Sequence, residues 1–375
     1  MPDFSSALYL GLCHDHGSLR PWRQLTIGRP AALGSTRETD ELECALARFL
    51  GCEAVAVGPS TFHLFWDLFD MFADDDIAVH IDSGAYAIAR WAVESVAGRG
   101  VPVRTFRSHD AGALGTSLAL SPTKPMPLVL VDGVNPLSGE PAPLPDYISL
   151  VRRDTGWLIL DDTQALGIFG ERPGPARPFG LGGAGVPAWF GLSDPRLIRV
   201  ASLAKGFGVP LALIGASRPI IERFKAVSKT RVHCSPPSQA DVTAAQRALE
   251  VNARRGDALR ERLLSLVRLF QQGLRSFDLA AQGGRFPMQT LILPPQVPAA
   301  GLHAALDWSG VATVLHRAHR GSEALISFLL NASHTSADIE TGLDALRLLV
   351  TAPIRQKPAC SSRSSSHGKI VAVQS

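Results

Sequence analysis

Two apolar segments of the sequence end in polar residues that could act together on one small molecule. One runs from Trp157 to Leu160 and continues as Asp161-Asp162-Thr163-Gln164, and the other reads Val200-Ala201-Ser202-Leu203-Ala204-Lys205-Gly206. A lone lysine among small and apolar residues loses hydration of its charged form, so its pKa falls and its amine becomes a usable nucleophile. Such an amine can form a Schiff base with an aldehyde cofactor, and a carboxylate at the end of a neighbouring strand could keep a pyridine nitrogen protonated.

Each segment alone has an ordinary structural explanation. Asp161-Asp162 could cap the start of a helix, and Lys205 could be a solvated lysine in a turn. Both segments, however, follow apolar runs, and open α/β sheets bind their ligands at the carboxyl ends of the strands. The two segments together therefore favour a cofactor site over the two separate explanations.

The elements that must position these residues alternate along the first two thirds of the chain. Short runs rich in Val, Ile and Leu indicate buried strands, and the longer patterns between them indicate helices. The predicted strands are Ile77–Ile81, Leu128–Val131, Trp157–Leu160, Ile198–Ser202 and Ala212–Gly215, and the predicted helices include Glu41–Leu50, Phe62–Phe72, Ala87–Val96 and Leu144–Arg153. This alternation predicts an α/β domain with a largely parallel sheet.

The pattern changes at about Gln239. A long amphipathic stretch reaches about Phe277, and it is followed by predicted strands at 289–293 and 325–330 and a helix at 337–349. We therefore expect an N-terminal segment (1–40), a large domain (41–238), a smaller α+β domain (239–351) and a disordered Ser-rich tail (352–375).

The composition excludes several classes of protein. With 46% hydrophobic and 19% charged residues, the 375-residue chain can bury a large core. No apolar run approaches the ~20 residues that span a bilayer, and Met1 to Leu12 has no basic start or extended apolar stretch. We therefore expect a soluble, cytoplasmic protein with no membrane partner.

Charge and metal-ligand spacing exclude further classes. The formal net charge is +3, but residues 352–375 carry four basic residues and no acid, so residues 1–351 sum to −1. The folded part is not basic, which argues against nucleic-acid binding. The five cysteines include no C-x-x-C pair, and the eleven histidines show no H-E-x-x-H spacing. We therefore predict neither disulfides nor a metal site.

The glycine-rich stretch 181–185 is a separate feature. We interpret it as a flexible loop over the active site rather than as a phosphate-binding loop for a nucleotide.

The ordered set of motifs resembles the α-oxoamine synthases, a family of fold-type I pyridoxal-phosphate (PLP) enzymes, from about Leu8 to Leu349. Besides the two segments above, the resemblance is carried by Tyr9-Leu10-Gly11-Leu12, Leu42-Glu43, Phe49-Leu50-Gly51, Asp132-Gly133-Val134, Gly139-Glu140, Ala142-Pro143-Leu144 and His334-Thr335. The resemblance implies an α/β, aspartate aminotransferase-like PLP-dependent transferase fold and a homodimer. It also implies PLP as the cofactor.

The resemblance assigns roles to individual residues. Lys205 matches the lysine that forms the Schiff base with PLP, and Asp161 matches the aspartate that pairs with the pyridine nitrogen. Ser202 matches the family's Ser or Thr that binds the cofactor phosphate. Ser60-Thr61-Phe62 matches a Ser-Gly-aromatic turn whose backbone N–H groups bind the same phosphate at a helix N-terminus.

Two family histidines are replaced in this chain. Tyr86 occupies the position of the histidine that stacks on the pyridine ring, so the stacking face is kept and the imidazole is lost. Gln164 replaces the histidine that reaches the phenolic oxygen of the cofactor. An amide can donate that hydrogen bond but cannot titrate.

The substrate-binding positions differ more. Where the family has an arginine that binds the substrate carboxylate, the strand 324–328 contains Ser327 and no arginine. Where it has a second contact, an asparagine, the chain has Ala7. Serine cannot replace a bidentate arginine on a carboxylate. The segment 316–320 offers cations, although a solvated basic loop also explains it.

The leading interpretation is a PLP-dependent transferase that acts on an amine or amino-acid-derived substrate through a Schiff base and a ring-stabilised carbanion, with an acyl thioester as co-substrate and C–C bond formation as the outcome. The alternatives are an aminotransferase or an elimination or replacement enzyme of a biosynthetic pathway. A non-catalytic PLP-binding sensor or scaffold is the alternative of another class.

Overall fold

A seven-stranded sheet forms the centre of the larger part of the chain. The computed structural model describes residues 1–120, 125–317 and 324–351. The strand order is β1-β9-β8-β7-β4-β2-β3. β9 runs in the direction opposite to that of the other six strands. The strands are β1 (Ala54–Gly58), β2 (Ile77–Asp82), β3 (Val103–Phe106), β4 (Met126–Asp132), β7 (Trp157–Asp161), β8 (Leu197–Ser202) and β9 (Ala212–Ala216). The mostly parallel sheet predicted from the sequence is confirmed.

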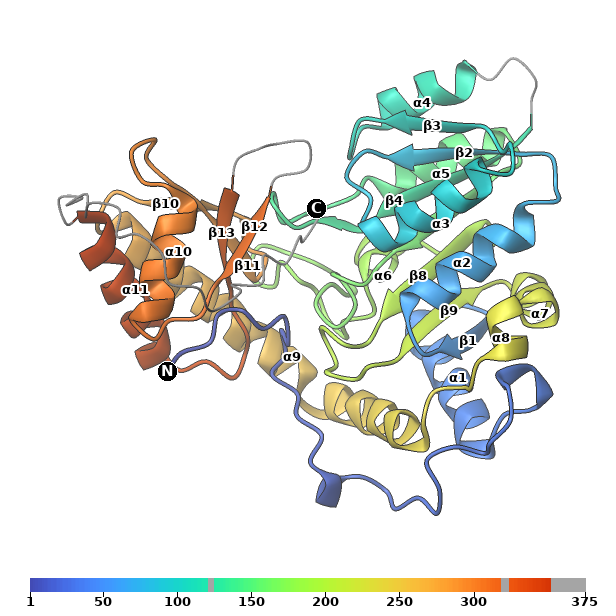
Figure 1. The fold of residues 1–375 in the computed structure, drawn as a ribbon, viewed down its shortest axis with the longest axis horizontal. Helices are drawn as coiled ribbons and strands as arrows, with labels where there is room; N and C mark the ends of the chain where they lie inside the picture. Colours follow the sequence, from blue (N-terminus) through green and yellow to red (C-terminus); the bar gives the residue numbers. More distant parts are fainter. Residues whose placement is uncertain (121–124, 318–323, 352–375) are drawn as a thin grey trace, which may run out of the picture. The chain divides into compact units, whose positions relative to one another are not determined.

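Helices follow most of these strands (Figure 1). They are α1 (Arg37–Leu50), α2 (Thr61–Phe72), α3 (Ala87–Ala97), α4 (Ala111–Ala119), α5 (Leu144–Arg153), α6 (Val186–Phe190), α7 (Arg218–Val227) and α8 (Lys229–His233). A short hairpin joins β5 (Val134–Asn135) and β6 (Glu140–Pro141), and single 3₁₀ turns lie at His16–Ser18 and Ala31–Leu33.

The core of this part lies between the sheet and α2 and α3, which pack side by side. Phe65, Phe69 and Phe72 of α2 contact the core together with Val79 of β2 and Ile198 of β8. Each of these side chains is removed from water. Burial of a large apolar side chain stabilises the fold by roughly 1.5–3 kcal/mol, so the core fixes the sheet whose strand ends carry the polar residues.

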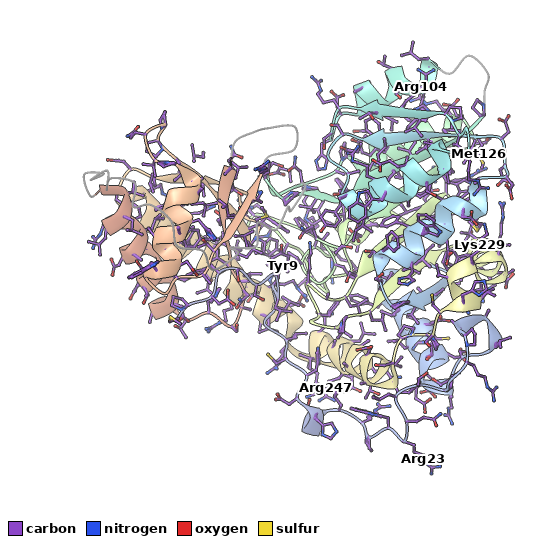
Figure 2. The ribbon with its side chains drawn as sticks, in the orientation of Figure 1. Tyr9, Arg23, Arg104, Met126, Lys229 and Arg247 are labelled. Atoms are coloured by element: carbon purple, nitrogen blue, oxygen red, sulfur yellow. The ribbon has the colours of Figure 1, made fainter. Side chains whose placement is uncertain are left out.

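A second, four-stranded antiparallel sheet follows the long helix α9 (Gln239–Arg275). Its order is β10-β11-β13-β12. The strands are β10 (Ala280–Gln282), β11 (Met288–Ile292), β12 (Val314–Arg317) and β13 (Ala324–Leu329), and the helices are α10 (Ala299–Trp308) and α11 (Ser336–Thr351). Figure 2 shows the side chains of both sheets.

The chain divides into two compact units. The large unit comprises Leu8–Asn135 and Glu140–Glu261, and the small unit comprises Met1–Ala7, Pro136–Gly139 and the chain from Arg262 onward. The division falls at Glu261/Arg262, inside the continuous helix α9, and not at 238/239, where the sequence pattern changes. The tail 352–375 lies outside the described residues.

The segment 181–185 differs from the prediction of a flexible loop. The Gly182 N–H donates to Asp257 at 2.9 Å, and the Gly167 N–H donates to the carbonyl of Gly183 at 2.8 Å. Gly185 has φ +92°, and a Cβ there would lie 1.8 Å from a carboxylate oxygen of Asp162. These hydrogen bonds hold the segment in place, and at Gly183 and Gly185 the packing leaves no room for a Cβ. Composition alone does not distinguish such a packed glycine-rich segment from a flexible loop.

No helix in the described part of the chain is both long and apolar enough to span a membrane. Within the same residues, no group of three or more His, Cys, Asp or Glu side chains is arranged to hold a metal ion.

Candidate active site

The predicted site residues follow the carboxyl ends of four parallel strands of the large unit. Tyr86 follows β2, Ser60-Thr61-Phe62 follows β1, Asp161 and Gln164 end and follow β7, and Ser202 and Lys205 end and follow β8. Because parallel strands end at the same edge of a sheet, one edge carries all of them.

Lys205 presents an amine without a partner. Within the described residues it forms no hydrogen bond or ion pair, and its Nζ lies 5.8 Å from the centre of the Tyr86 ring. Burial lowers the pKa of Lys205, and the negative charges of Asp161 and Asp132 oppose this shift. The amine therefore has a larger neutral fraction than an exposed lysine, as a nucleophile requires.

Two carboxylates lie side by side at the ends of β7 and β4. Asp161 pairs in register with Asp132, a residue that the sequence analysis noted only as part of a motif. Burial raises the pKa of Asp161, although hydrogen bonds from Thr163, one of them a backbone N–H at 3.0 Å, oppose the shift. Burial and the charge of Asp161 raise the pKa of Asp132 well above its usual value. No basic side chain of the described residues forms an ion pair with Asp161.

Asp162, the next residue, has a different role. Its carboxylate forms a fully buried ion pair with Arg199 at 2.7 Å and accepts the Val186 N–H at 3.2 Å. Arg199 also donates to the carbonyl groups of Leu50 and Ala184. The Asp162–Arg199 pair therefore holds together β8, the end of α1 and the 181–185 segment. Asp161 has no such ion pair with a basic side chain among the described residues.

Replacement of Asp162 by asparagine is expected to destabilise the fold. Arg199 is 3% exposed, and it would lose the one ion-pair partner that it has among the described residues. Removing one partner of a buried pair costs about 3–5 kcal/mol. Urea unfolding should show a lower midpoint for Asp162→Asn, while Asp161→Asn, the same change at the neighbouring residue, should unfold near wild type. Equal midpoints for Asp162→Asn and wild type would contradict this role.

The N-terminus of α2 is open to an anion. Ser60 is the N-cap, but its side chain makes no capping bond; its Oγ contacts His63 Nδ1 at 2.8 Å instead. Thr61 begins the helix and is not in the left-handed region, so the residue that replaces the family's glycine causes no strain. Phe62, at the first turn, is partly exposed and contacts Trp66. Uncapped N–H groups at a helix N-terminus favour a phosphate.

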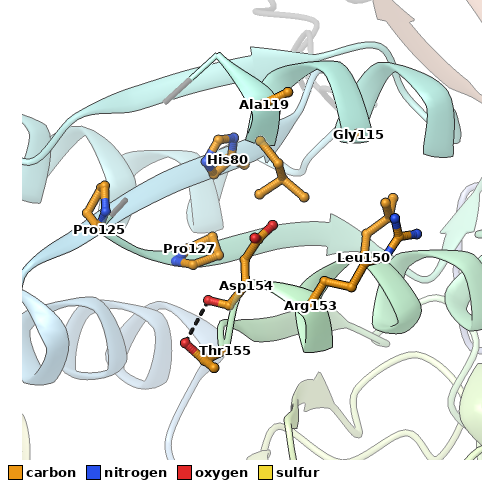
Figure 3. A pocket seen from close by; sticks show the side chains of 10 residues that line it. His80, Gly115, Ala119, Pro125, Pro127, Leu150, Arg153, Asp154 and Thr155 are labelled. Atoms are coloured by element: carbon orange, nitrogen blue, oxygen red, sulfur yellow. Dashed lines mark hydrogen bonds between the residues drawn. The ribbon is translucent and has the colours of Figure 1, made fainter. Parts of the chain in front are cut away.

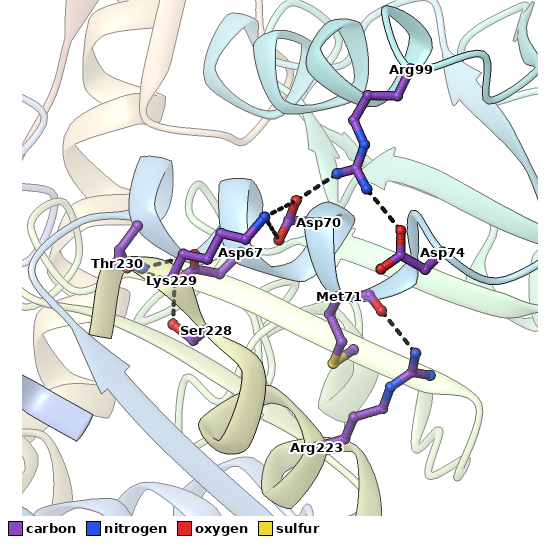
Figure 4. A network of polar contacts seen from close by, with 9 residues as sticks. All are labelled: Asp67, Asp70, Met71, Asp74, Arg99, Arg223, Ser228, Lys229 and Thr230. Carbon is purple, nitrogen blue, oxygen red and sulfur yellow. Dashed lines mark hydrogen bonds and ion pairs between the residues drawn. The ribbon is translucent and has the colours of Figure 1, made fainter. Parts of the chain in front are cut away.

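A polar network on the side of α2 fixes this helix (Figure 4). The carboxylate of Asp67 accepts hydrogen bonds from Ser228 Oγ and, at 3.1 Å, from the Thr230 N–H. Asp70 forms ion pairs with Lys229 at 2.9 Å and Arg99 at 2.6 Å. These contacts join the middle and the last turn of α2 to α8 and to the end of α3.

The remaining predicted residues are positioned by neighbouring loops. The Ser202 N–H donates to Thr163 Oγ1 at 3.1 Å, and Ser202 Oγ accepts the Ala204 N–H at the same distance. Gln164 Oε1 accepts a hydrogen bond from the hydroxyl of Tyr9 at 2.8 Å. Tyr9 was not predicted as a site residue; the signal was present, since it begins the Tyr9–Leu12 motif.

In the small unit, Ser327 is not available to bind a ligand. It is 0% exposed, and its Oγ contacts Thr290 Oγ1 at 2.7 Å and His316 Nε2 at 2.8 Å. Burial lowers the pKa of His316, so this residue is not a substitute cation. Arg317 is exposed, and residues 318–320 lie outside the described part of the chain.

A pocket of about 520 Å³ lies at the opposite ends of the strands (Figure 3). It is lined by His80, Pro127 and Thr155 among others. His80 contacts Ser117 Oγ at 2.8 Å, and burial lowers its pKa to about 4. The pocket is separate from the edge that carries Lys205.

No protein-family model matches the chain. It is 31% identical over 254 residues to an 8-amino-7-oxononanoate synthase of Ralstonia pickettii, a match that covers 65% of this chain and 58% of that protein. A 29% identity over 366 residues to the same enzyme of Halorhodospira halophila covers 93% and 85%. The chain thus spans less than two thirds of the Ralstonia protein.

A solved structure of serine palmitoyltransferase with PLP superimposes with a TM-score of 0.78 at 21% identity, covering 92% of this chain and 85% of that one. A likeness at this identity shows the fold. The fold predicted from the sequence is therefore confirmed: the chain has the α/β, fold-type I architecture of PLP-dependent transferases, and its sequence resembles the α-oxoamine synthases.

Proposed function

We propose that the protein is a PLP-dependent transferase of the α-oxoamine synthase type. Its substrate is an amine or an amino-acid-derived compound, its co-substrate an acyl thioester, and its product contains a new C–C bond. The observation that carries the proposal is the unpartnered amine of Lys205 beside the unpaired, buried carboxylate of Asp161. The similarity to 8-amino-7-oxononanoate synthases supports this reaction type.

The residues present fit PLP. Its aldehyde needs an amine with a lowered pKa, which Lys205 offers, and its ring nitrogen needs a carboxylate without a protein cation, which Asp161 offers. Its phosphate needs N–H and hydroxyl donors, which the α2 N-terminus at Ser60-Thr61-Phe62 and Ser202 offer. Tyr86 supplies an aromatic face and Gln164 an amide.

When bound, PLP supplies an aldehyde for a Schiff base and a ring that takes up electron density. The protein supplies the proton transfers and the orientation. Lys205 Nζ can release a proton more readily than an exposed lysine because burial lowers its pKa. Burial and the charges of Asp161 and Asp132 raise the pKa of Tyr86, so Tyr86 stays a neutral aromatic surface. Of these two residues, Lys205 is therefore the one that transfers the proton.

Release of free thiol tests this reaction type. Purified protein with PLP, an amine panel and acyl thioesters should release thiol only when amine and thioester are both present. An aminotransferase would instead form an oxo product without thioester, and an elimination enzyme would release ammonia or a leaving group. A PLP-binding sensor would change its spectrum without turnover. Any of these three results would replace the proposal.

The assembly and location are also proposals. We propose a homodimer, as in the resembled family, which sedimentation at micromolar concentration tests against a monomer mass of 40.0 kDa. We propose a cytoplasmic location, which fractionation of cells tests. Its substrates are small molecules, and neither a nucleic acid nor a membrane is among the proposed partners.

Glycine, L-alanine and L-serine are expected to bind weakly to the PLP-loaded protein. Ser327 is bonded to Thr290 and His316 and cannot hold a carboxylate, and Ala7 has no donor side chain. A carboxylate in a dry site without a charged partner costs several kcal/mol. The substrate is therefore larger or is bound at a distant group, for which Arg317 and Arg320 are candidates.

Spectral titration measures this binding, with L-alaninol as the matched amine that lacks a carboxylate. L-Alanine should bind no more tightly than L-alaninol. Saturation by any of the three amino acids below about 1 mM, an ordinary enzyme affinity, would show that a carboxylate site exists.

A further inference from the structure

Tyr9 and Gln164 form a hydrogen bond that joins the N-terminal loop to the end of β7. The hydroxyl of Tyr9 donates to Gln164 Oε1 at 2.8 Å, and both residues belong to the large unit. Tyr9, labelled in Figure 2, is 1% exposed. Burial raises the pKa of Tyr9 far above its usual value, so the phenol keeps its proton and remains a donor.

This bond fixes which end of the amide faces away from Tyr9. An amide has an oxygen that only accepts and a nitrogen that only donates. Because Oε1 is bound to Tyr9, the two N–H groups of Nε2 remain for another partner. Among the described residues, Gln164 has no second hydrogen bond. Gln164, three positions after Asp161, therefore presents N–H donors at Nε2 that have no protein acceptor among the described residues.

We propose that Tyr9 is a positioning residue that locks Gln164 with its Nε2 donor toward the phenolic oxygen of PLP. The inference rests on the proposed function. An unlocked amide could rotate and place Oε1 against that oxygen, where two acceptors repel each other. A residue that selects one orientation is therefore required once an amide stands at this position.

The expected consequence is spectroscopic. A donor on the phenolic oxygen stabilises the negative charge that this oxygen carries after the Schiff-base proton leaves. It therefore lowers the pKa of the Schiff base between PLP and Lys205. Loss of the donor, or of its orientation, raises that pKa, which the pH dependence of the visible absorbance reports directly and without turnover.

A double-mutant cycle tests the proposal on the PLP-loaded protein. Tyr9→Phe removes one oxygen, and Gln164→Leu removes the amide. Each single change should raise the midpoint of the pH titration by about 0.5–1 unit, which corresponds to one hydrogen bond. The double variant should match Gln164→Leu alone, because the proposed effect of Tyr9 on the phenolic oxygen passes through Gln164.

Tyr147→Phe is the matched control. Tyr147 is also fully buried, and burial raises its pKa far above the usual value, as it does for Tyr9. It lies in α5, outside the predicted site residues. This variant should leave the midpoint unchanged, so a shift in Tyr9→Phe cannot be ascribed to loss of a buried phenol in general. Urea unfolding of both variants shows whether each is folded.

The failing outcomes are distinct. Additive shifts, or an unchanged midpoint in Tyr9→Phe or in Gln164→Leu, would overturn the role of Tyr9 while leaving PLP binding intact. If Tyr9→Phe is unfolded, the cycle is completed with Gln164→Glu, which keeps the acceptor for Tyr9 but has no donor; an unchanged midpoint there would also overturn the proposal. A wild-type protein that takes up no PLP would instead overturn the proposed function.

Discussion

Replacement of Lys205 by alanine is expected to leave a folded protein that no longer holds PLP covalently and has lost turnover by about 10²–10⁴-fold or more. The fold should survive because Lys205 makes no hydrogen bond or ion pair within the described residues. Turnover should not survive, since the residue supplies both the attachment point and the proton transfer. The absorbance of the dialysed protein and its steady-state rate measure the two losses.

Lys229→Ala is the matched control for this change. Lys229 lies in α8 and pairs with Asp70 at the surface, where such pairs contribute little to stability. The variant should keep bound PLP and nearly all activity. Covalently attached PLP in Lys205→Ala, or its loss in Lys229→Ala, would show that another amine carries the cofactor.

Replacement of Asp161 by asparagine is the second change with a large expected effect. The variant should still bind PLP, because the phosphate and ring contacts come from other strand ends. Its turnover should fall roughly 10²–10³-fold, the usual effect of removing one preorganised electrostatic contact, since a neutral amide cannot keep the ring nitrogen protonated. Its PLP affinity and rate, measured separately, check both parts.

Asp162→Asn separates the two neighbouring carboxylates. At a temperature where it remains folded, its rate per bound PLP should fall much less than that of Asp161→Asn, because Asp162 is occupied by Arg199. An equal rate loss in both variants, or a loss at Asp162 alone, would show that Asp161 is not the carboxylate that pairs with the ring nitrogen.

Most strands could be predicted because parallel strands are buried on both faces and appear as apolar runs. β2, for example, is buried throughout its length, and its prediction is confirmed. β1 and β3 were missed for opposite reasons. β1 has the sequence AVAVG, which lacks large residues, and β3 is an edge strand whose Val103 and Thr105 are exposed. The direction of β9 depends on long-range pairing that no local pattern specifies.

The chemistry of the candidate site could be read from residue types that follow strands, but the contacts between loops could not. Lys205 and Asp161 stand out because each follows an apolar run. The Asp162–Arg199 pair spans 37 residues and the Tyr9–Gln164 bond spans 155, so neither leaves a local signal. Ser327 was recognised as a departure, while its burial with Thr290 and His316 is a property of the folded sheet.

Borohydride reduction followed by peptide mapping tests the central claim most directly. The PLP-loaded wild-type protein is reduced, digested and analysed by mass spectrometry for a pyridoxyl group on lysine. The predicted result is one modified site, Lys205, at the carboxyl end of β8. A pyridoxyl group on any other lysine, or none at all on protein that has been saturated with PLP, would contradict the account.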